Sequence, residues 1–255
     1  VDKLRRKNEG IDFISICSPN YLHDAHIRFS LRSNAHAICE KPLVLNPWNV
    51  DAIQNVELDY EKKVYTILQL RLHPVIISLR KQYEKLQDTI ADIDVTYITS
   101  RGNWYYQSWK GDISKSGGIA TNIGIHFFDM LSWIFGPYES SIIHVNTKDC
   151  ASGILRLKNA RVRWFLSINP DHLPEEQKIK GQRTFRSIRV KGEDLEFSEG
   201  FTDLHTESYR QILLGNGFTI QEARNSIEIV HQIRNAPLSP LKDDYHPFCN
   251  LTMSR

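Results

Sequence analysis

Two side chains of this sequence could handle a proton, the amine of Lys41 and the imidazole of His126. Lys41 follows residues 35–39, a short apolar run that is typical of a buried parallel strand. Open α/β sheets bind ligands at the carboxyl ends of such strands, so an ammonium there could polarise a hydroxyl and stabilise a developing alkoxide. The alternative is a solvated loop lysine, because most lysines are exposed. The neighbouring Glu40 and Pro42 favour the functional interpretation.

His126 lies in a helix predicted from about residue 122 to 134, three residues before Asp129 and on the same helix face. An imidazole with a pKa near neutrality is suited to accept the proton of a secondary alcohol, and a neighbouring polar group could fix its tautomer. A lone helical histidine is more often structural. The preceding Gly117-Gly118 pair and Asn122 strengthen the catalytic interpretation.

The first 70 residues alternate between strand and helix patterns. Apolar runs at 11–17, 35–39 and 64–70 predict strands, and the segment 21–34 predicts a helix. A second helix is expected to begin at Asn46-Pro47, a capping residue followed by a first-turn proline, and to end near residue 60. This alternation predicts a doubly wound α/β sheet over residues 1–70.

The pattern changes after residue 70. Helices are predicted at 75–86 and 220–235 and a half-exposed strand at 90–100, with an irregular stretch from 101 to 118. Further strand-like runs follow without intervening helices, at residues 141–145, 153–157, 162–168 and 185–191. This succession predicts an α+β domain with a largely antiparallel sheet over residues 71–255.

The composition is that of an ordinary globular protein. Hydrophobic residues make up 41% and charged residues 24% of the chain, and no apolar run reaches the roughly 18 residues of a membrane span. The net charge of +2 and the lack of a basic tract argue against nucleic acid as a partner. The four cysteines form no CxxC pair, which predicts neither a metal site nor a disulfide framework. We therefore expect a cytoplasmic protein with free thiols.

Three blocks of the sequence resemble the signature of a known family: Ser15 to His23, Cys39 to Leu43, and Gly117-Gly118 followed by Asn122 to Asp129. In order and spacing they are similar to the Gfo/Idh/MocA oxidoreductases. The stretches 46–49 and 101–106 further resemble members that oxidise UDP-N-acetylglucosaminuronic acid at C3 for bacterial lipopolysaccharide O-antigen synthesis. The resemblance implies a Rossmann-like dinucleotide-binding domain, an α+β domain for substrate binding and oligomerisation, and NAD as cofactor, with NADP left open.

The resemblance also implies roles for individual residues. Lys41 and His126 are the expected catalytic pair. The expected cofactor contacts are Cys17, Ser18, Pro19, Asn20, His23, Glu40, Lys41 and Trp109. The expected substrate contacts are Lys41, Arg101, Tyr106, Lys110, Asn122 and His126. The family often has aspartate where this chain has Asn122, so we expect Asn122 to hydrogen-bond the sugar instead of supporting His126 by charge.

Several of these positions have a plain alternative. The Ser18-Pro19-Asn20 turn could be an ordinary strand-to-helix turn with a capping side chain. The aromatic loop at 104–110 could be a packing plug or an oligomer contact instead of a cover for nicotinamide and sugar. A uronate and a diphosphate both need cations, for which the further candidates are Arg71, Lys178, Lys180, Arg183 and Arg186, most of them expected to be solvated.

No GxGxxG motif occurs in these 255 residues, although the family resembled here normally opens with one. We expect that on the order of two βα units, about 60 residues, are lacking at the start of the nucleotide domain. We expect a fragment of a longer enzyme; the alternative is a chain that never bound a dinucleotide.

The same scaffold could carry a different activity. The complete protein could be a free-sugar or inositol dehydrogenase of this family, or a non-catalytic regulatory protein that binds a dinucleotide without turnover. Retention of Lys41 and His126 argues against the regulatory protein. A homo-oligomer, dimer or tetramer, is expected by analogy, because an antiparallel sheet with one helix-covered face often presents the other face to a partner.

Overall fold

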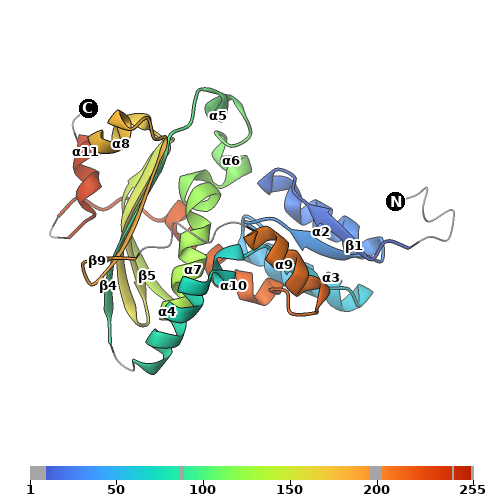
Figure 1. The fold of residues 1–255 in the computed structure, drawn as a ribbon. Helices are drawn as coiled ribbons and strands as arrows, with labels where there is room; N and C mark the ends of the chain where they lie inside the picture. Colours follow the sequence, from blue (N-terminus) through green and yellow to red (C-terminus); the bar gives the residue numbers. More distant parts are fainter. Residues whose placement is uncertain (1–9, 87–88, 196–202, 243, 254–255) are drawn as a thin grey trace.

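The computed structural model describes residues 10–86, 89–195, 203–242 and 244–253. It contains two sheets, a small parallel one near the amino terminus and a larger mixed one, with helices between them (Figure 1). The predicted fold class, a Rossmann-like unit followed by an α+β unit, is confirmed.

The small sheet has the parallel order β1-β2-β3, and among the described residues β1 is an edge strand of this sheet. Its elements are β1 (Phe13–Ile16), η1 (Asn20–Leu22), α2 (His23–Arg32), β2 (His36–Cys39), α3 (Pro47–Tyr60) and β3 (Val64–Thr66). The strand predicted at 64–70 is shorter than expected. Its last residues form a 3₁₀ turn, η2 (Gln69–Leu72), which carries the chain away from the sheet.

The large sheet has the order β5-β6-β7-β4-β8-β9. Its strands are β4 (Ala91–Thr99), β5 (Tyr138–Asn146), β6 (Cys150–Leu157), β7 (Ala160–Ser167), β8 (Thr184–Val190) and β9 (Glu193–Asp194). All pairings are antiparallel except β4 with β7, which is parallel. The prediction of a largely antiparallel sheet is therefore confirmed.

The helical elements of the second unit are α4 (Pro74–Lys85), α5 (Trp104–Gln107), α6 (Ile113–Ser116), the π-helical turn η3 (Ala120–Gly124), α7 (Ile125–Phe135), η4 (Pro170–His172), α8 (Glu175–Ile179), α9 (Leu204–Leu213), α10 (Ile220–Asn235), η5 (Pro247–Cys249) and α11 (Asn250–Met253). Helices α4 and α7 lie on the side of the large sheet that faces the small sheet, and α8 and α11 lie on its other side (Figure 1). The predicted helix at 220–235 coincides with α10. The sequence did not predict α9, and the stretch predicted as irregular contains α5 and α6.

Helix α10 packs against both units, because it contacts α7 of the second unit and α3 of the first. The residue just before it, Thr219, forms a bridge with Tyr65 of β3, and Thr66 N donates to Phe218 O at 2.9 Å. One hydrophobic core runs from Ile16 to Ile233 through both units. After the second unit the chain thus returns to contact the first. The domain division at residue 70 stays a prediction.

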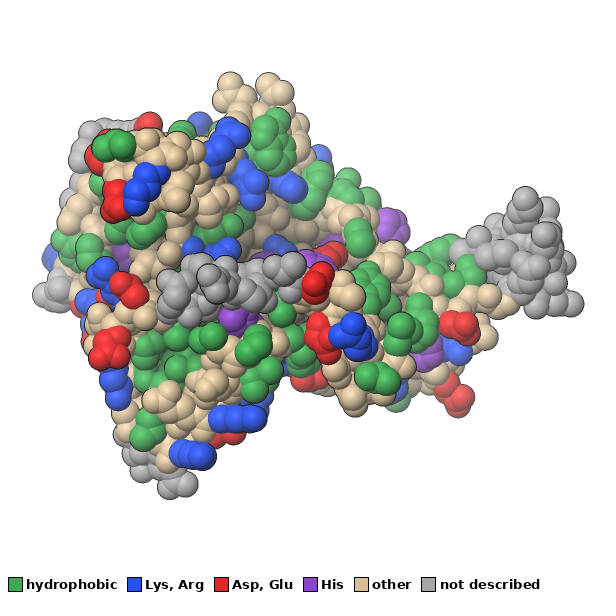
Figure 2. Space-filling model, in the orientation of Figure 1, with side chains coloured by type: hydrophobic (Ala, Val, Ile, Leu, Met, Phe, Trp, Pro, Cys, Tyr) green, Lys and Arg blue, Asp and Glu red, His purple; other side chains and the backbone are tan. Residues whose placement is uncertain are grey.

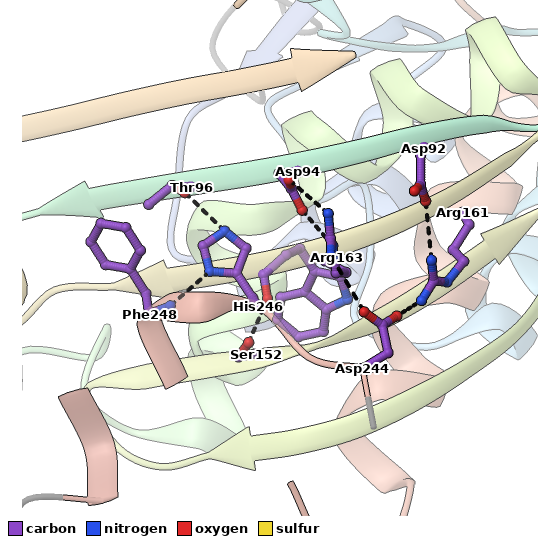
Figure 3. A network of polar contacts seen from close by, with 10 residues as sticks. Asp92, Asp94, Thr96, Ser152, Arg161, Arg163, Asp244, His246 and Phe248 are labelled. Carbon is purple, nitrogen blue, oxygen red and sulfur yellow. Dashed lines mark hydrogen bonds and ion pairs between the residues drawn. The ribbon is translucent and has the colours of Figure 1, made fainter. Parts of the chain in front are cut away.

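The opposite face of the large sheet meets the C-terminal segment (Figure 3). Thr96 Oγ1 of β4 lies 3.0 Å from His246 Nε2, and Arg163 of β7 forms a double hydrogen bond with Asp94 at 2.6 and 2.9 Å. Asp244 of the C-terminal segment forms an ion pair with Arg161, which also lies in β7. The chain's own C-terminal segment therefore occupies part of the sheet face that we expected to be free for a partner.

No helix of the described residues is both long and apolar enough to cross a membrane. Within the same residues no group of three or more His, Cys, Asp or Glu side chains is arranged to hold a metal ion. The four cysteines lie within the described residues and form no disulfide; Cys17 is exposed and the other three are buried.

Candidate functional site

A cavity of about 290 Å³ lies where the small sheet, α7 and the large sheet meet. Its wall includes residues from both units: Lys41, Gln69, Leu70, Tyr97, Arg101, Tyr105, Lys110, Asn122, Ile123, His126, Phe127 and Arg186. Figure 2 shows Lys and Arg side chains around the hollow between the two halves of the molecule. Both residues predicted to handle the proton, Lys41 and His126, line this one cavity.

Lys41 enters the cavity from the loop that follows β2. The loop is anchored on the sheet, since Glu40 N donates to Ile16 O of β1 at 3.0 Å. The Lys41-Pro42 peptide is cis, and Lys41 Nζ donates to the backbone carbonyl of Asn122 at 2.9 Å. Burial lowers the pKa of Lys41 from its ordinary value of 10.5 to about 8; Glu40 opposes this shift, and Lys110 and Arg101 add to it.

His126 lies in the first turn of α7, directly after the π-helical turn η3. A π-helical turn is a common feature of functional sites. Gly124 lets this turn approach β7 closely, because a Cβ at that position would lie 2.5 Å from Leu166 Cδ1. Burial holds the pKa of His126 well below its ordinary value of 6.5, and the charge of Lys41 lowers it further. The imidazole is therefore neutral near pH 7 and can accept a proton.

Asp129 does not orient His126, contrary to the possibility raised by their spacing. Its carboxylate accepts two hydrogen bonds from the buried Arg71, at 2.7 and 2.9 Å. Arg71 also donates to the backbone carbonyl of Glu222 at 2.9 Å. The guanidinium of Arg71 thus has its hydrogen-bond partners inside the protein. Arg71 is therefore not available to bind an anionic ligand, although it was one of the candidate cations.

Asn122 is buried in η3 and lines the cavity. Its side-chain Nδ2 donates to the hydroxyl of Tyr105 at 2.7 Å, so part of its hydrogen-bonding capacity is used within the protein. Its carbonyl holds Lys41. Contact between Asn122 and a sugar stays a prediction.

The cavity is strongly cationic. Lys41, Arg101, Lys110 and Arg186 are four of its twelve described lining residues, and none of the twelve is acidic. Lys110 Nζ lies 5.4 Å from the ring centroid of Trp104, and the Arg186 guanidinium lies 5.4 Å from that of Tyr97. A site with this charge favours an anionic ligand.

Tyr106 and Trp109, predicted as substrate and cofactor contacts, lie outside the lining of this cavity, and Tyr105 takes the inward position. The reason is the short helix α5. Successive helical residues point about 100° apart, so when Tyr105 is buried its neighbour Tyr106 faces outward, where Lys148 lies over its ring. Trp109 is half-buried beside Lys110.

The expected cofactor contacts in the turn after β1 divide into two groups. Cys17 is exposed, and Ser18 and Pro19 are half-buried at the carboxyl end of the strand. Asn20 is buried and donates to the carbonyl of Ser116 at 2.9 Å. His23 is also buried and lies outside the lining of the cavity, and its contact with the cofactor stays a prediction.

Besides Tyr105, five lining residues were not predicted as contacts: Gln69, Leu70, Tyr97, Ile123 and Phe127. Gln69 could have been predicted from the sequence, because it is a polar residue just beyond the carboxyl end of a parallel strand. Its Oε1 atom is buried and accepts no hydrogen bond from any described residue. Glu40, an expected cofactor contact, lies 3.3 Å from His205 of α9. The candidate cations Lys178 and Lys180 pair with Glu175 and Glu176 away from the cavity.

Two family profiles cover most of the chain. Residues 88–237 match the oxidoreductase family C-terminal alpha/beta domain, and residues 1–68 match the oxidoreductase family NAD-binding Rossmann fold. The chain belongs to the Gfo/Idh/MocA oxidoreductase family. The resemblance noted in the sequence is thereby confirmed.

Among solved structures of Gfo/Idh/MocA proteins, the chain is similar to the WlbA (WbpB) dehydrogenase from Thermus thermophilus in complex with NAD and UDP-GlcNAcA. The two are 48% identical with a TM-score of 0.91, over 97% of this chain and 80% of that one. A second complex of that enzyme, with NAD and alpha-ketoglutarate, gives 49% identity and the same TM-score and coverage. The Bordetella pertussis WlbA structure, at 17% identity and a TM-score of 0.73, supports the fold alone.

The curated relatives are more distant. The putative oxidoreductase YteT of Bacillus subtilis is 26% identical over 185 residues, which are 69% of this chain and 38% of that protein. Inositol 2-dehydrogenase of Rhizobium meliloti is 30% identical over 133 residues, which are 52% of this chain and 39% of that enzyme. The chain thus spans about two-fifths of the length of the curated relatives it matches.

Proposed function

We propose that the protein containing this chain oxidises the C3 hydroxyl of UDP-N-acetylglucosaminuronic acid to a 3-keto sugar, with NAD as the hydride acceptor. The observation that carries the proposal is the similarity to the Thermus thermophilus enzyme with NAD and UDP-GlcNAcA, which extends over 97% of this chain. The cationic cavity lined by Lys41 and His126 supports it, because the uronate and the diphosphate of this substrate are anions.

The residues on the nucleotide side of the cavity fit a nicotinamide dinucleotide. Ser18 and Pro19 follow β1 at the carboxyl edge of the parallel sheet, where dinucleotides bind. Gln69 Oε1 is a buried acceptor without a described partner, and an N–H of a carboxamide or a hydroxyl would satisfy it. When bound here, NAD would supply the acceptor for the hydride that leaves the sugar carbon.

The two proton-handling residues divide the work according to their charges. Neutral His126 accepts the proton of the hydroxyl as general base, because burial and Lys41 keep its pKa low. The Lys41 ammonium stabilises the oxygen while negative charge develops on it. The electron pair of the O–H bond becomes part of the new carbonyl as the electron pair of the C–H bond departs with the hydride.

The four lining cations favour a uronate over a neutral sugar. A cation that has been desolvated for a carboxylate is left unpaired when that carboxylate is missing, and this costs binding and rate. Arg101 carries this role in our proposal, because it lines the cavity and is exposed enough to meet a ligand. Free sugars and inositol, which carry no anionic group, fit this wall less well.

The test is a comparison of substrates with the complete protein. Oxidation of UDP-N-acetylglucosaminuronate, followed by NADH absorbance, should exceed that of UDP-N-acetylglucosamine in kcat/KM on the order of 10²-fold. Arg101→Ala should reduce this ratio. Arg183→Ala, which removes an exposed arginine outside the cavity, is the matched control and should preserve it. Equal kcat/KM values for the two nucleotide sugars, or faster oxidation of inositol, would contradict the proposal.

We further propose that the protein acts in the bacterial cytoplasm as a homo-oligomer, dimer or tetramer, in lipopolysaccharide O-antigen synthesis. This part of the proposal is supported by the sequence resemblance. Light scattering coupled to size-exclusion chromatography of the complete protein measures the oligomeric state, and a monomer would contradict this part.

A further inference from the structure

His23 is held between two backbone carbonyls that belong to the two loops of the nucleotide side. Its Nδ1 atom lies 2.7 Å from the carbonyl oxygen of Pro42, and its Nε2 atom lies 2.8 Å from that of Ser18. The ring is buried at 1% exposure. Pro42 directly follows Lys41, and Ser18 lies in the turn after β1. One imidazole therefore connects the lysine loop to the turn.

Both neighbours of this ring are hydrogen-bond acceptors, so each contact requires an N–H on the imidazole. A neutral ring has one N–H, whereas the protonated ring has two. The charged and titratable groups near the ring are Glu40 and His26. Burial and His26 disfavour the protonated ring, and the two carbonyls and Glu40 favour it. The neutral ring donates to only one of the two carbonyls, and its bond to Pro42 O requires the N–H on Nδ1.

The lysine loop is anchored further along by the buried Leu43 and by a hydrogen bond from Arg234 to Leu45 O at 3.1 Å, but few bonds hold the backbone next to Lys41. Pro42 has no N–H, so its carbonyl is its sole backbone hydrogen-bonding group. On the other side of Lys41, Glu40 N is bonded to Ile16 O at 3.0 Å. The backbone of Lys41 is thus fixed by one bond to β1 before it and by the His23 bond after it.

We propose that His23 is a positioning residue for Lys41: by donating from Nδ1 to the Pro42 carbonyl, next to the turn that holds Ser18, its ring fixes the direction in which the lysine side chain enters the cavity. Without this ring the Pro42 carbonyl loses its donor, and the short segment between Glu40 and the buried Leu43 can shift relative to the turn. Lys41 then loses its bond to Asn122 O and its burial. The proposal depends on the proposed function for its kinetic readout alone, because the environment of Lys41 can be measured without substrate.

The test compares His23→Ala and His23→Gln with wild type in the complete protein. Lys41 is acylated with an amine-directed reagent across a pH series, and its peptide is quantified by mass spectrometry. The midpoint should be about 8 in wild type and should rise toward 10.5 in His23→Ala as Lys41 becomes solvated. A rise of about one unit would lower the acylation rate at pH 8 about fivefold. His23→Gln, which keeps an N–H donor, should lie between the two.

The matched control is His36→Gln. His36 Nδ1 accepts a hydrogen bond from Lys63 N at 2.9 Å at the start of β2, at the opposite end of the strand from Lys41. This variant also removes a histidine bond to the backbone of the same sheet, and it should leave the Lys41 midpoint unchanged. If His23→Ala does not fold, His23→Gln carries the test. A folded His23 variant with an unchanged Lys41 midpoint would overturn the proposal.

The kinetic readout separates this proposal from the proposed function. If the wild-type protein oxidises UDP-N-acetylglucosaminuronate, His23→Ala should lower kcat more than tenfold with a smaller change in the KM for the sugar. A purely structural histidine would lower the melting temperature and leave both kcat and the Lys41 midpoint in place. If wild type shows no turnover, the proposed function fails, and the acylation midpoint still decides the role of His23.

Discussion

The ammonium of Lys41 donates a 2.9 Å hydrogen bond to the backbone carbonyl of Asn122. Lys41 follows a strand of the small sheet, and Asn122 lies in the π-helical turn before α7, so this bond joins the two walls of the cavity. An ammonium has three donors, and this bond uses one of them. Two remain for a substrate oxygen, which allows Lys41 to hold the walls together and to stabilise a developing alkoxide.

The charge of Lys41 predicts the alkaline limb of the pH profile. Its pKa is about 8 in the folded protein, so the ammonium is present below that pH and is lost as the pH rises through it. We expect kcat/KM for oxidation, which reports ionisations of the free protein, to fall above about pH 8 along a single ionisation. Lys41→Arg stays charged and should lack this limb, although its lower kcat would reflect the altered geometry. A limb that persists unchanged in Lys41→Arg would assign it to another group. Initial rates from pH 6 to 10 measure it.

Asn122→Asp should move this limb to higher pH. An anion near Lys41 favours the ammonium, and a close opposite charge shifts a pKa by about one unit or more. The same charge should raise the KM for an anionic sugar, because the cavity wall has no acidic residue among its described members. Tyr105→Phe removes the 2.7 Å bond to Asn122 without adding charge and serves as the control. If Asn122→Asp, like the control, left the alkaline limb at the wild-type pH, the charge at position 122 would have no effect on the pKa of Lys41.

The Arg71–Asp129 pair should matter for stability. Both side chains are almost fully buried, and Asp129→Asn would leave the Arg71 charge without its double carboxylate contact. We expect the free energy of unfolding to fall by about 3 kcal/mol, the lower end of the range for breaking a buried pair. Asp24→Asn breaks the partly exposed i,i+4 pair with Arg28 and should cost about 0–1 kcal/mol. Urea denaturation of both variants gives the comparison, and equal losses would contradict it.

The sequence predicted what local patterns determine. The alternation of strand and helix indicated the parallel sheet, and the 3.6-residue period of the last helix predicted bounds that coincide with Ile220–Asn235. Lys41 could be placed because it follows a strand. Helix α9 was missed because its buried side consists of Leu204, Ser208 and Ile212, a narrow stripe with one polar member.

The remaining differences depend on long-range contacts. Arg71 and Asp129 are 58 residues apart, and the sequence around each of them does not indicate that they form an ion pair. The inward position of Tyr105 instead of Tyr106 follows from the phase of a four-residue helix, which is too short to leave a periodic pattern. The sequence could place His23 near the turn after β1. It could not predict that the ring is buried against the Pro42 carbonyl, because that partner lies 19 residues away in the chain.

Lys41 and His126 should act as one unit in the complete protein. They line the same cavity, and the charge of Lys41 is one cause of the low pKa of His126. General-base catalysis contributes about 10²–10⁴-fold, so His126→Asn should lower kcat by that order and leave NAD binding nearly intact. Lys41→Met should have a similar effect on kcat, and it should also raise the pKa of His126, measurable by NMR, because a neighbouring positive charge is removed.

The double variant decides whether the two residues are coupled. Residues that act as a unit have non-additive effects, so Lys41→Met combined with His126→Asn should be scarcely slower than the poorer single variant. Independent residues would instead give a loss equal to the product of the two single losses. The measurement is single-turnover kinetics with saturating NAD and UDP-N-acetylglucosaminuronate, with NAD affinity determined separately by fluorescence titration. A His126→Asn protein with near-normal kcat would remove His126 from the mechanism, whatever the result for Lys41.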